Sequence, residues 1–568
     1  MAQNIVIIGA VALGPKAACR LKRLEPESHV VLIDQSDLIS YGGCGIPYFI
    51  SGDVSDPGQL RSTSFNMLRD EKFFQDAKDI QTMTHTKATS IDPMGKKVHV
   101  KHMQSGEESV LPYDKLVLAT GSRPKRLSIP GSDLEGVFTV SNLDDAIAIK
   151  EKVAGGQVGK ACIIGGGAIG LEMAEALSDL WGIDTSVVEF KDQILPGILS
   201  SKMAHMAQMH MAENGVSFYL SERVVSLSGD GMISSVVTEK REIEADLVIM
   251  SVGVDPNGEL AKAAGLATSE SGAVVVDKTM RTSNPHIFAG GDCVEIQNLV
   301  TGKPGYFPSG SLANRQGRVI GTNLAGGDMD FDGAVGSFVV KLFDISLASV
   351  GLCLDAAQRE GFDAVSAFVA QFDRAHFYPE KEIMYLELVV ERGSKRILGI
   401  QGLGDKGDGM VGRINAVASI LKSRPTTEEI SNMELAYSPP FTAAMDILNA
   451  LGNTADNILN GMNRVVDVEE FSDMWNEKER EETYFLDCRG WGNAEPFVTK
   501  YPLHWKSIPQ DELRTRLAEV PKDKRIVLIC NTGVRSYEAQ ITLDQMGIKN
   551  TLNLQGGVAA LKKWGADL

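Results

Sequence analysis

ACIIGGGAIGLEMAEAL, residues 161–177, joins an apolar strand pattern to a helical pattern through a run of glycines. Gly165, Gly167 and Gly170 fill the three glycine positions of a G-x-G-x-x-G turn. Such a turn lets the backbone approach a pyrophosphate, which also binds to the N-terminus of the following helix. The stretch therefore predicts a dinucleotide-binding unit built on a parallel α/β sheet.

The acidic residue after this turn indicates which dinucleotide binds. Glu189 ends the next strand, TSVVE, nineteen residues after Gly170, where a carboxylate can accept hydrogen bonds from an adenosine ribose diol. The carboxylate would repel a 2'-phosphate, so we expect NADH. NADPH stays possible because Lys191 lies close enough to weaken the preference.

A second, altered copy of the pattern lies near the start of the chain. Residues 4–8, NIVII, read as a buried strand, and Gly9, Val11 and Gly14 occupy the three turn positions. Val11 replaces the central glycine, but Asp34 ends the next strand at the spacing of a ribose-binding acid. The pattern favours a second dinucleotide site, and an ordinary strand-helix-strand unit is the alternative.

Bulk composition excludes several classes of function. The 568-residue chain is too long for one hydrophobic core, so several domains are expected. Its formal net charge of -18, without a long basic run, argues against nucleic acid as a partner. No stretch reaches the ~18 apolar residues of a membrane span, and the first residues read as a strand and turn rather than a signal peptide. The seven cysteines contain no C-x-x-C pair, which predicts reduced thiols, no metal site and a cytoplasmic location.

Two further segments, LVLATGSRP (116–124) and TSNPHIFAGGDCVE (282–295), resemble motifs of the two-dinucleotide-binding flavoprotein disulfide reductases. The resemblance implies that the N-terminal turn holds FAD, with Thr120 and Gly121 at the cofactor, and that the other turn holds NADH. It also implies that Asp292 hydrogen-bonds the ribityl chain of FAD. A helix N-cap is the alternative role of this residue.

The candidate reactive residue is Cys44, in SYGGCGIPYFISGDV (40–54). Flanking glycines leave its sulfur accessible, and a nearby helix N-terminus or oxidised flavin would lower the pKa of its thiol; an inert thiol is the alternative. The segment resembles the S-x-x-x-C-G-x-P-Y motif of the single-cysteine branch of that superfamily, which contains coenzyme A disulfide reductases, persulfide reductases, and NADH oxidases and peroxidases. Phe49 stands where two-cysteine reductases have a partner thiol, so Cys44 is expected to pair with an external sulfur.

Other residues match positions that bind coenzyme A in this branch. Arg20 and Arg23 are three residues apart on the first helix, so both could reach phosphates; a solvated helix face is the alternative. The resemblance places Ser40 and Tyr41 along the channel of the pantetheine arm. Gly43 departs from the polar residue that many relatives have there.

NRQGRVIGTNLAGG (314–327) and AYSPPFTAAMDILNALG (436–452) resemble the entry into and the end of the dimerisation domain of this branch. Tyr437 matches a tyrosine that reaches the cysteine of the partner subunit and can protonate a leaving thiolate; simple packing at the dimer interface is the alternative. Tyr378 is retained where relatives often have two tyrosines, but Phe377 replaces the first. The substrate pocket is therefore expected to differ from that of a strict coenzyme A disulfide reductase.

After a polar connection at 453–462, a new alternation of strands and helices begins at VVDVEEF. Its first helix is expected at DELRTRLAEV (511–520), and the alternation predicts a small, separate α/β domain. Cys530 ends a buried strand and precedes a glycine-containing loop and a helix, so backbone N–H groups can stabilise its thiolate or persulfide. Arg535 adds positive charge on the same side.

The loop CNTGVRS (530–536), flanked by LDCRG and NLQGGVAALKKWG, resembles the active site of rhodanese sulfurtransferases. The resemblance implies that Cys530 carries sulfane sulfur as a persulfide. A phosphatase loop, which has C-x5-R spacing and also binds an anion, is the alternative; here four residues separate Cys530 from Arg535. Cys488 is expected to belong to the core.

The predicted fold class is α/β, with two Rossmann-like dinucleotide-binding domains, an α+β dimerisation domain and a C-terminal α/β rhodanese-like domain. The expected bounds are 1–123 with 256–325 for FAD, 124–255 for NAD(P)H, 326–452 for dimerisation and 463–568 for the rhodanese-like domain.

The expected function is reduction of a small persulfide, polysulfide or disulfide by NAD(P)H through FAD and Cys44, with coenzyme A as substrate or bound thiol and Cys530 as sulfur carrier. We expect a homodimer whose partner subunit completes the active site. Three alternatives stay open: a coenzyme A disulfide reductase with an independent sulfurtransferase domain, an NADH oxidase or peroxidase using a Cys44 sulfenic acid, and a sulfurtransferase or redox-sensing scaffold with a vestigial flavin.

Overall fold

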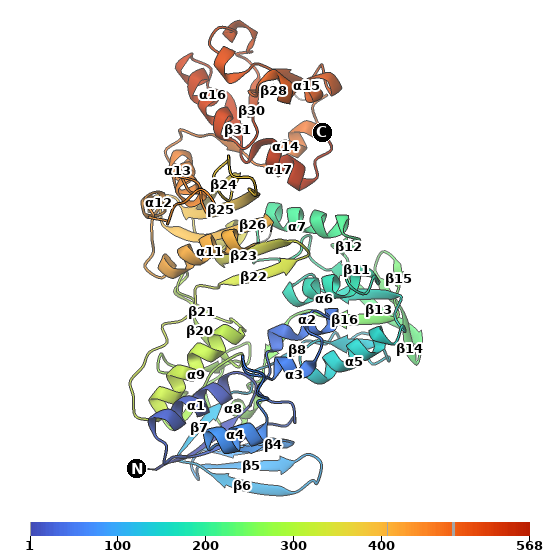
Figure 1. Ribbon diagram of the computed structural model, residues 1–568, viewed down its shortest axis with the longest axis vertical. Helices are drawn as coiled ribbons and strands as arrows, with labels where there is room; N and C mark the ends of the chain where they lie inside the picture. Colours follow the sequence, from blue (N-terminus) through green and yellow to red (C-terminus); the bar gives the residue numbers. More distant parts are fainter. Residues whose placement is uncertain (1, 406, 480–482) are drawn as a thin grey trace. The chain divides into compact units, whose positions relative to one another are not determined.

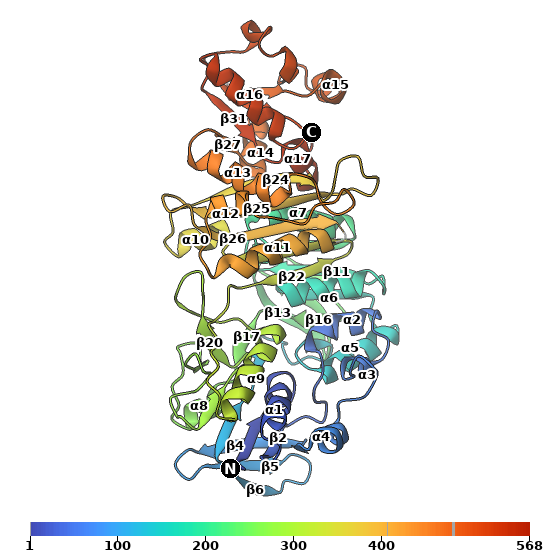
Figure 2. The ribbon, with the colours of Figure 1, turned by 60° about the vertical axis from the view of Figure 1, so that its left-hand side comes forward.

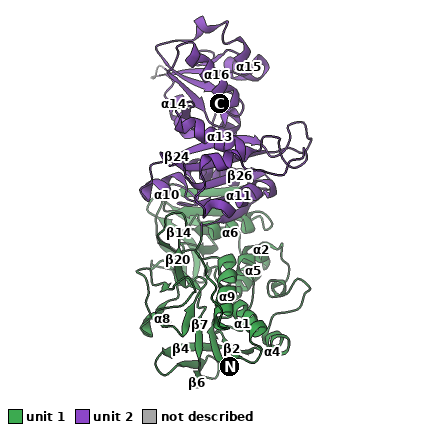
Figure 3. Ribbon diagram, turned by 90° about the vertical axis from the view of Figure 1, so that its left-hand side faces the viewer, with its two compact units in different colours: residues 1–192, 215–334 green, residues 193–214, 335–568 purple. Residues whose placement is uncertain are grey.

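The computed structural model describes residues 2–405, 407–479 and 483–568. It forms two compact units, one of residues 1–192 and 215–334 and the other of residues 193–214 and 335–568 (Figure 3). The segment 193–214 thus belongs with the second unit, although it falls within the predicted NAD(P)H-binding domain. The structure divides the chain into two units and does not divide it further. The bounds of the four predicted domains therefore stay predictions.

The first sheet of the first unit, whose strand β7 is labelled in Figure 1, is parallel throughout, with strand order β19-β7-β1-β2-β3. Its strands are β1 (Asn4–Ile8), β2 (His29–Ile33), β3 (Gln81–Met83), β7 (Lys115–Leu118) and β19 (Ile287–Ala289). The central strand β1 is buried apart from its first residue, as expected where helices cover both faces of a parallel sheet. Helices α1 (Leu13–Leu24) and α9 (Gly310–Leu324) pack against each other beside it (Figure 2). The predicted strand at 4–8 and the helix that follows it are confirmed.

A second parallel sheet, β12-β11-β10-β16-β9, carries the glycine turn at 165–170. Its strands are β9 (Val137–Thr139), β10 (Lys160–Ile164), β11 (Asp184–Glu189), β12 (Val216–Leu220) and β16 (Leu247–Met250). Helix α6 (Ala168–Ser178) begins inside the turn, with Gly167 as its N-cap residue, and α5 (Leu143–Ala154) precedes β10. The stretch at 161–177 therefore forms the strand-turn-helix unit that its glycine spacing predicts.

Shorter elements complete the first unit. Its described residues form four further small sheets. The first contains β4 (Thr86–Asp92), β5 (Lys97–His102) and β6 (Glu108–Pro112), and the second contains β13 (Val224–Asp230), β14 (Met232–Thr238) and β15 (Glu242–Glu244). The third contains β8 (Ser122–Pro124) and β17 (Val254–Pro256), and the fourth contains β18 (Val274–Val275), β20 (Val294–Gln297) and β21 (Pro304–Gly305). The short helices are α2 (Ile46–Ser51), α3 (Pro57–Leu60), α4 (Glu71–Lys78) and α8 (Glu259–Ala263).

The second unit contains an antiparallel sheet, β22-β23-β26-β25-β24, whose α11 packs against β23 and β26 (Figure 2). The strands are β22 (Phe338–Leu342), β23 (Ile345–Gly351), β24 (Ala364–Phe372), β25 (Ile383–Glu391) and β26 (Ile397–Asp405). The helices are α7 (Ser201–Glu213), α10 (Leu354–Arg359), α11 (Asp408–Leu421), α12 (Thr427–Ser431) and α13 (Ile447–Leu459). This is the α+β arrangement expected of the dimerisation segment.

The last part of the chain forms a parallel sheet, β27-β31-β30-β28-β29. Its strands are β27 (Val465–Val466), β28 (Thr483–Asp487), β29 (Trp505–Ser507), β30 (Arg525–Ile529) and β31 (Thr551–Leu554). The helices are α14 (Val468–Asn476), α15 (Trp491–Lys500), α16 (Val534–Gln545) and α17 (Gly557–Trp564). The alternation of strands and helices confirms the α/β fold of this part of the chain, and with it the predicted fold class.

Two local predictions are wrong. Residues 511–520 form two short 3-10 turns, at Gln510–Glu512 and Leu517–Glu519, instead of a helix; only Leu513 and Val520 are buried there, too few for an apolar helix face. The polar connection expected at 453–462 is largely the solvated half of α13, whose opposite face buries its apolar residues.

Two kinds of feature are absent from the described residues. None of their helices is both long and apolar enough to cross a bilayer. Nor do these residues bring together three or more His, Cys, Asp or Glu side chains able to hold a metal ion.

Candidate functional site

Cys44 lies in a tight turn of the first unit. It is the middle residue of a 3-10 turn, Gly43–Gly45, that leads directly into α2. A Cβ atom at Gly45 would lie 2.5 Å from Cδ2 of Leu60, so a larger residue here would require the Leu60 side chain to shift. Cys44 itself is exposed, and an external sulfur compound can therefore reach its thiol.

The N-terminus of α9 faces this thiol. An ideal Cβ at Gly310, the first residue of α9, would lie 3.9 Å from Sγ of Cys44. Asp292 supports the same helix end, because its Oδ1 accepts the backbone N–H of Ser309 at 3.0 Å and its Oδ2 accepts the hydroxyl of Ser122 at 3.4 Å. Asp292 therefore orders the start of a helix that comes later in the chain.

The electrostatic environment of Cys44 differs from the sequence-based expectation. Partial burial and then the charges of Glu172 and Asp292 raise the pKa of the Cys44 thiol, and the N–H groups of Cys44 and Gly310 oppose this only in part. The helix N-terminus expected to lower the pKa is present, but the protein's own groups favour the neutral thiol. Burial and then Glu175 raise the pKa of Glu172 to about 7, so the charge nearest to Cys44 on α6 changes near neutral pH.

The two predicted dinucleotide turns are built in the same way. Asp34 accepts the backbone N–H of Ala10 in the first turn at 2.7 Å and that of Ser36 at 3.0 Å. Glu189 accepts the backbone N–H of Gly166 in the second turn at 2.7 Å. It also accepts the backbone N–H of Lys191 at 2.7 Å. Each carboxylate keeps further lone pairs, so both remain suited to a ribose diol.

Both turns fit a dinucleotide. At four glycines an ideal Cβ would lie 2.5 Å or less from a backbone oxygen, so that no side chain fits at Gly9, Gly14, Gly165 or Gly170. The Cβ position of Gly167 has no atom within 4 Å, which leaves room for a pyrophosphate at the start of α6. Val11, the corresponding residue of the first turn, is only partly buried. The residues thus fit FAD at the first turn and NAD(P)H at the second.

Thr120 and Gly121 lie at the carboxyl end of β7, next to β19 and the Asp292 segment. The Thr120 hydroxyl donates to the carbonyl of Asn257 at 2.7 Å, and Gly121 has a φ of +64°, which favours glycine. These residues, predicted to contact FAD, therefore share one sheet edge with the first glycine turn.

The predicted coenzyme A residues differ in their surroundings. Arg20 is partly buried and its Nε donates to Thr322 Oγ1 of α9 at 3.0 Å, whereas Arg23 is exposed. Ser40 is buried, with a φ of +54°. Burial and then nearby carboxylates raise the pKa of Tyr41 to about 12. Arg23 thus presents its charge to solvent, while Arg20 is committed in part to the packing of α1 on α9.

Two loops of the second unit carry the predicted tyrosines. The N–H of Ala375 donates to the carbonyl of Pro439 at 3.3 Å, which joins the loop of Tyr378 to the loop of Tyr437. Tyr437 is 52% exposed and Phe377 is 66% exposed. The two hydrogen-bonded loops therefore each carry an exposed aromatic side chain.

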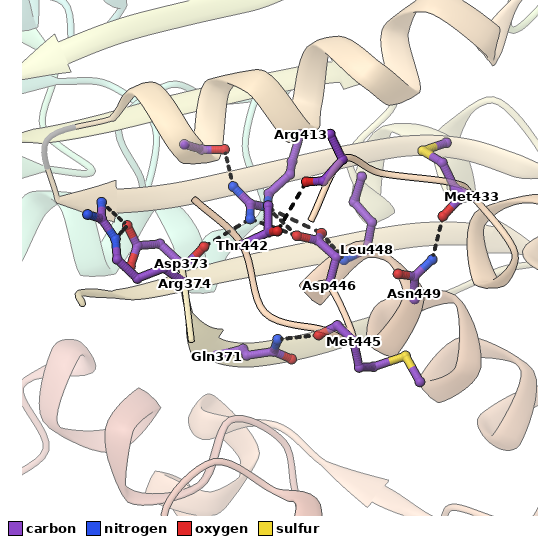
Figure 4. Close-up of polar contacts among 12 residues, drawn as sticks. Gln371, Asp373, Arg374, Arg413, Met433, Thr442, Met445, Asp446, Leu448 and Asn449 are labelled. Atoms are coloured by element: carbon purple, nitrogen blue, oxygen red, sulfur yellow. Dashed lines mark hydrogen bonds and ion pairs between the residues drawn. The ribbon is translucent and has the colours of Figure 1, made fainter. Parts of the chain in front are cut away.

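A buried ion pair anchors both loops (Figure 4). Arg413 of α11 pairs with Asp446, the N-cap residue of α13, at 2.7 Å, and its Nη2 also donates to the carbonyl of Asp373 at 2.9 Å. Gln371 Nε2 donates to the carbonyl of Met445 at 2.8 Å. Both loops are therefore tied at their bases to the antiparallel sheet and its helix.

Cys530 follows β30 and begins the loop that leads into α16. It is 2% exposed, and its Sγ accepts hydrogen bonds from the N–H of Gly533 at 3.1 Å and the hydroxyl of Ser536 at 3.2 Å. Arg535 is exposed in the first turn of α16. Cys488 is buried, and its burial, followed by Cys530 and Asp487, raises the pKa of its thiol; this agrees with a core residue.

Sequence reasoning missed several residues that contact the candidate reactive atoms or affect their charge. Glu172 and Ser536 lie inside the quoted motifs, where their residue types gave no sign of the contact. Ser122 and Ser309 are brought to Asp292 only by the fold, from 170 and 17 residues away.

Comparison with known proteins matches three successive parts of the chain. The pyridine nucleotide-disulphide oxidoreductase family matches residues 3–316, its dimerisation domain matches 337–448, and the rhodanese-like domain matches 467–563. The chain is 33% identical over 451 residues to the NAD(P)H coenzyme A polysulfide/persulfide reductase of Pyrococcus horikoshii, which covers 79% of this chain and 98% of that protein.

Solved structures agree over nearly the whole length. A NAD-dependent persulfide reductase from A. fulgidus shares 37% identity, covers 98% of this chain and 99% of its own, and superposes with a TM-score of 0.92. Reduced Bacillus anthracis CoADR-RHD shares 30% identity, with coverage of 99% and 98% and a TM-score of 0.90. With a family match over more than half of its residues, the chain belongs to the pyridine nucleotide-disulphide oxidoreductases and is an oxidoreductase that carries a C-terminal rhodanese-like domain.

Proposed function

We propose that this oxidoreductase reduces persulfides or polysulfides with NAD(P)H, with Cys44 as the attacking thiol and Cys530 as a carrier of sulfane sulfur. One observation carries the proposal: a single chain contains an exposed thiol in the unit with both dinucleotide turns and a second sulfur held by two hydrogen-bond donors. The printed names of the relatives from Pyrococcus horikoshii and A. fulgidus support the substrate class.

Reduction of a persulfide at Cys44 requires NAD(P)H as the source of two electrons. FAD, when bound, supplies the transfer of two electrons from NAD(P)H to sulfur. The Cys44 thiolate attacks the inner sulfur of a persulfide R–S–SH, the S–S bond breaks, and hydrosulfide leaves. Cys44 is then joined to the R–S group as a mixed disulfide, and two electrons and one proton return it to the thiolate with release of R–SH.

The carrier thiol R–SH is proposed to be coenzyme A. The exposed Arg23 and the partly buried Arg20 provide positive charge on α1 for its phosphates. Ser40 and Tyr41 lie four and three residues before Cys44, and we assign them to the pantetheine arm. The names of the Pyrococcus horikoshii and Staphylococcus aureus relatives, the second a coenzyme A disulfide reductase 26% identical over 454 residues, support this choice.

The active site is proposed to be completed in a homodimer. The exposed aromatic side chains of Phe377 and Tyr437 lie in the segment that matches the dimerisation domain. In this arrangement Tyr437 of the partner subunit would donate a proton to the leaving thiolate, and Tyr378 would line the pocket. The seven free cysteines support a reducing compartment, the cytoplasm, as the place of action.

Anaerobic NADH oxidation with polysulfide or coenzyme A persulfide tests the reductase function. Cys44→Ser should abolish sulfide release, whereas Cys19→Ser, which removes another partly accessible thiol, should retain it. Mass spectrometry of the purified protein should find a coenzyme A disulfide on Cys44. Oxygen consumption far above sulfide release would instead establish the NADH oxidase reaction named for a relative from Methanocaldococcus jannaschii.

The relay from Cys530 needs a separate test. Cys530→Ser should slow turnover of polysulfide, and Cys488→Ala, which alters the neighbouring buried thiol, should not. An unchanged polysulfide rate in Cys530→Ser would show that the rhodanese-like domain serves another reaction.

A further inference from the structure

Ser536 is the one side chain among the described residues that is shown donating a hydrogen bond to Sγ of Cys530. It lies in the first turn of α16 and is 0% exposed, with its hydroxyl 3.2 Å from the sulfur. The N–H of Gly533 reaches the same sulfur at 3.1 Å. A buried hydroxyl needs a partner, and here that partner is the sulfur atom itself.

We propose that Ser536 is a catalytic residue that promotes the discharge of sulfane sulfur from Cys530 to an acceptor. The proposal rests on the carrier role of Cys530 put forward above and assigns a direction to that role. The direction follows from the position of the Ser536 hydroxyl, which contacts Sγ of Cys530, the inner sulfur of a persulfide.

In a Cys530 persulfide the negative charge resides on the outer sulfur, and Sγ is bonded to two atoms. When an acceptor nucleophile attacks the outer sulfur, the S–S bond breaks and its electron pair goes to Sγ. The outer sulfur leaves joined to the acceptor, and Cys530 becomes a thiolate. The persulfide is reduced to a thiolate and the acceptor is oxidised by two electrons as it gains the sulfur atom, so no other oxidant or reductant is needed. The negative charge develops on the atom that faces Ser536 and Gly533.

Donors aimed at a developing charge stabilise the transition state more than the ground state. The Ser536 hydroxyl therefore lowers the barrier for breaking the S–S bond. Loading is the opposite case, because the Cys530 thiolate gives up its charge when it attacks a donor. The same hydrogen bond stabilises the thiolate before loading, so it does not favour accumulation of the persulfide.

The loop is held so that this geometry is prepared in advance. The carbonyl of Cys530 accepts the N–H of Val558 at 2.8 Å, and the carbonyl of Asn531 accepts the N–H of Ala559 at 2.9 Å. The first turn of α17 thus fixes the backbone on which Sγ is mounted, and α16 fixes Ser536. Donors that need no rearrangement during the reaction stabilise charge most effectively.

Rapid-quench mass spectrometry of the full-length protein separates the two half-reactions. Thiosulfate loads Cys530 and cyanide discharges it, and the mass of one added sulfur atom reports each step. In Ser536→Ala the discharge rate should fall about tenfold or more, as expected for loss of a hydrogen bond to a charged group. Loading should not slow, so the loaded fraction at steady state should rise. Ser536→Thr, which keeps the hydroxyl, should restore discharge.

Ser472→Ala is the matched control, because it removes a hydroxyl that bonds a helix carbonyl, that of Val468, in the same domain. Its loading and discharge rates should match those of the original protein. Equal discharge in Ser536→Ala, or an equal fall of loading and discharge, would overturn the assignment to Ser536. Failure of the original protein to acquire sulfur on Cys530 would instead refute its carrier role, so the two failures are distinguishable.

Discussion

Gln555 accepts the backbone N–H of Phe368 at 2.7 Å, which fastens the loop after β31 to the edge strand β24. Both residues are buried, and Tyr385 of β25 adds a hydrogen bond from its hydroxyl to the carbonyl of Ala559 at 3.2 Å. These hydrogen bonds join the rhodanese-like domain to the edge of the antiparallel sheet. We call these two hydrogen bonds, from Phe368 to Gln555 and from Tyr385 to Ala559, the seam. Gln555 lies just before α17, and α17 is hydrogen-bonded to the Cys530 loop, so the seam helps to hold that loop in place.

Gln555→Met should destabilise the second unit, because it leaves the buried N–H of Phe368 without an acceptor. The expected loss in the free energy of unfolding is ~1–3 kcal/mol, measured by calorimetry or denaturant unfolding. Gln545→Met changes an exposed glutamine of the same domain and should leave the transition unchanged. Identical melting of the two variants would contradict a stabilising seam.

Glu172→Gln should increase the reactivity of Cys44 above neutral pH. With its pKa raised to about 7, Glu172 is largely neutral below that pH and charged above it, and its charge raises the pKa of the Cys44 thiol. Removing the charge should increase alkylation of Cys44 at pH 8 by up to roughly tenfold, the effect of one pKa unit. Below pH 6 the two proteins should react alike.

The same substitution should alter the pH dependence of stability. The pKa of Glu172 is higher in the folded protein than in the unfolded chain, so the folded state binds more protons between about pH 4.3 and 7. This contribution to stability is present at low pH and is lost as the pH rises through that window. Glu172→Gln should flatten this decline, whereas Asp179→Asn, in the same pocket, should not.

Arg413→Met should destabilise the two tyrosine loops strongly, because it leaves the carboxylate of Asp446 buried without its partner. Breaking a buried ion pair costs about 3–5 kcal/mol, measurable as a lower denaturant midpoint. In the double variant Arg413→Met/Asp446→Asn the unpaired charge is gone, while the amide oxygen can still cap α13. Its loss of stability should be smaller, and an equal or larger loss would contradict the ion-pair account.

Glu189→Ala should reduce the preference for NADH over NADPH. The carboxylate is buried beside the second glycine turn, where it would repel a 2'-phosphate. We expect the ratio of kcat/KM for the two nucleotides to fall about tenfold, equivalent to ~1.4 kcal/mol. Asp192→Ala removes an exposed charge nearby and serves as the control. An unchanged ratio would show that other residues select the nucleotide.

The sequence alone determined the parts of this protein that depend on local spacing. Gly165, Gly167 and Gly170 predict their turn because only glycine fits where backbone approaches backbone, and Glu189 follows at a distance set by one helix and one strand. The isolation of Cys44 is likewise a local matter, since Phe49 occupies the position of a partner thiol. The position of Cys530, at the end of a strand and before a helix, was also predictable because it depends only on the local sequence pattern.

Only the tertiary structure decided the contacts that tune these residues. Glu172 and Asp292, which raise the pKa of Cys44, lie 128 and 248 residues further along the chain. A local sequence pattern does not predict contacts between residues so far apart. Residues 453–459 of the predicted polar connection are helical because α13 buries its apolar residues against a core. The charges at Cys44 come from distant segments, whereas the donors to Cys530, Gly533 and Ser536, are near in the sequence but reach its Sγ only through the folded shape of the loop. The sequence therefore predicted the two cysteines but not the contacts around them.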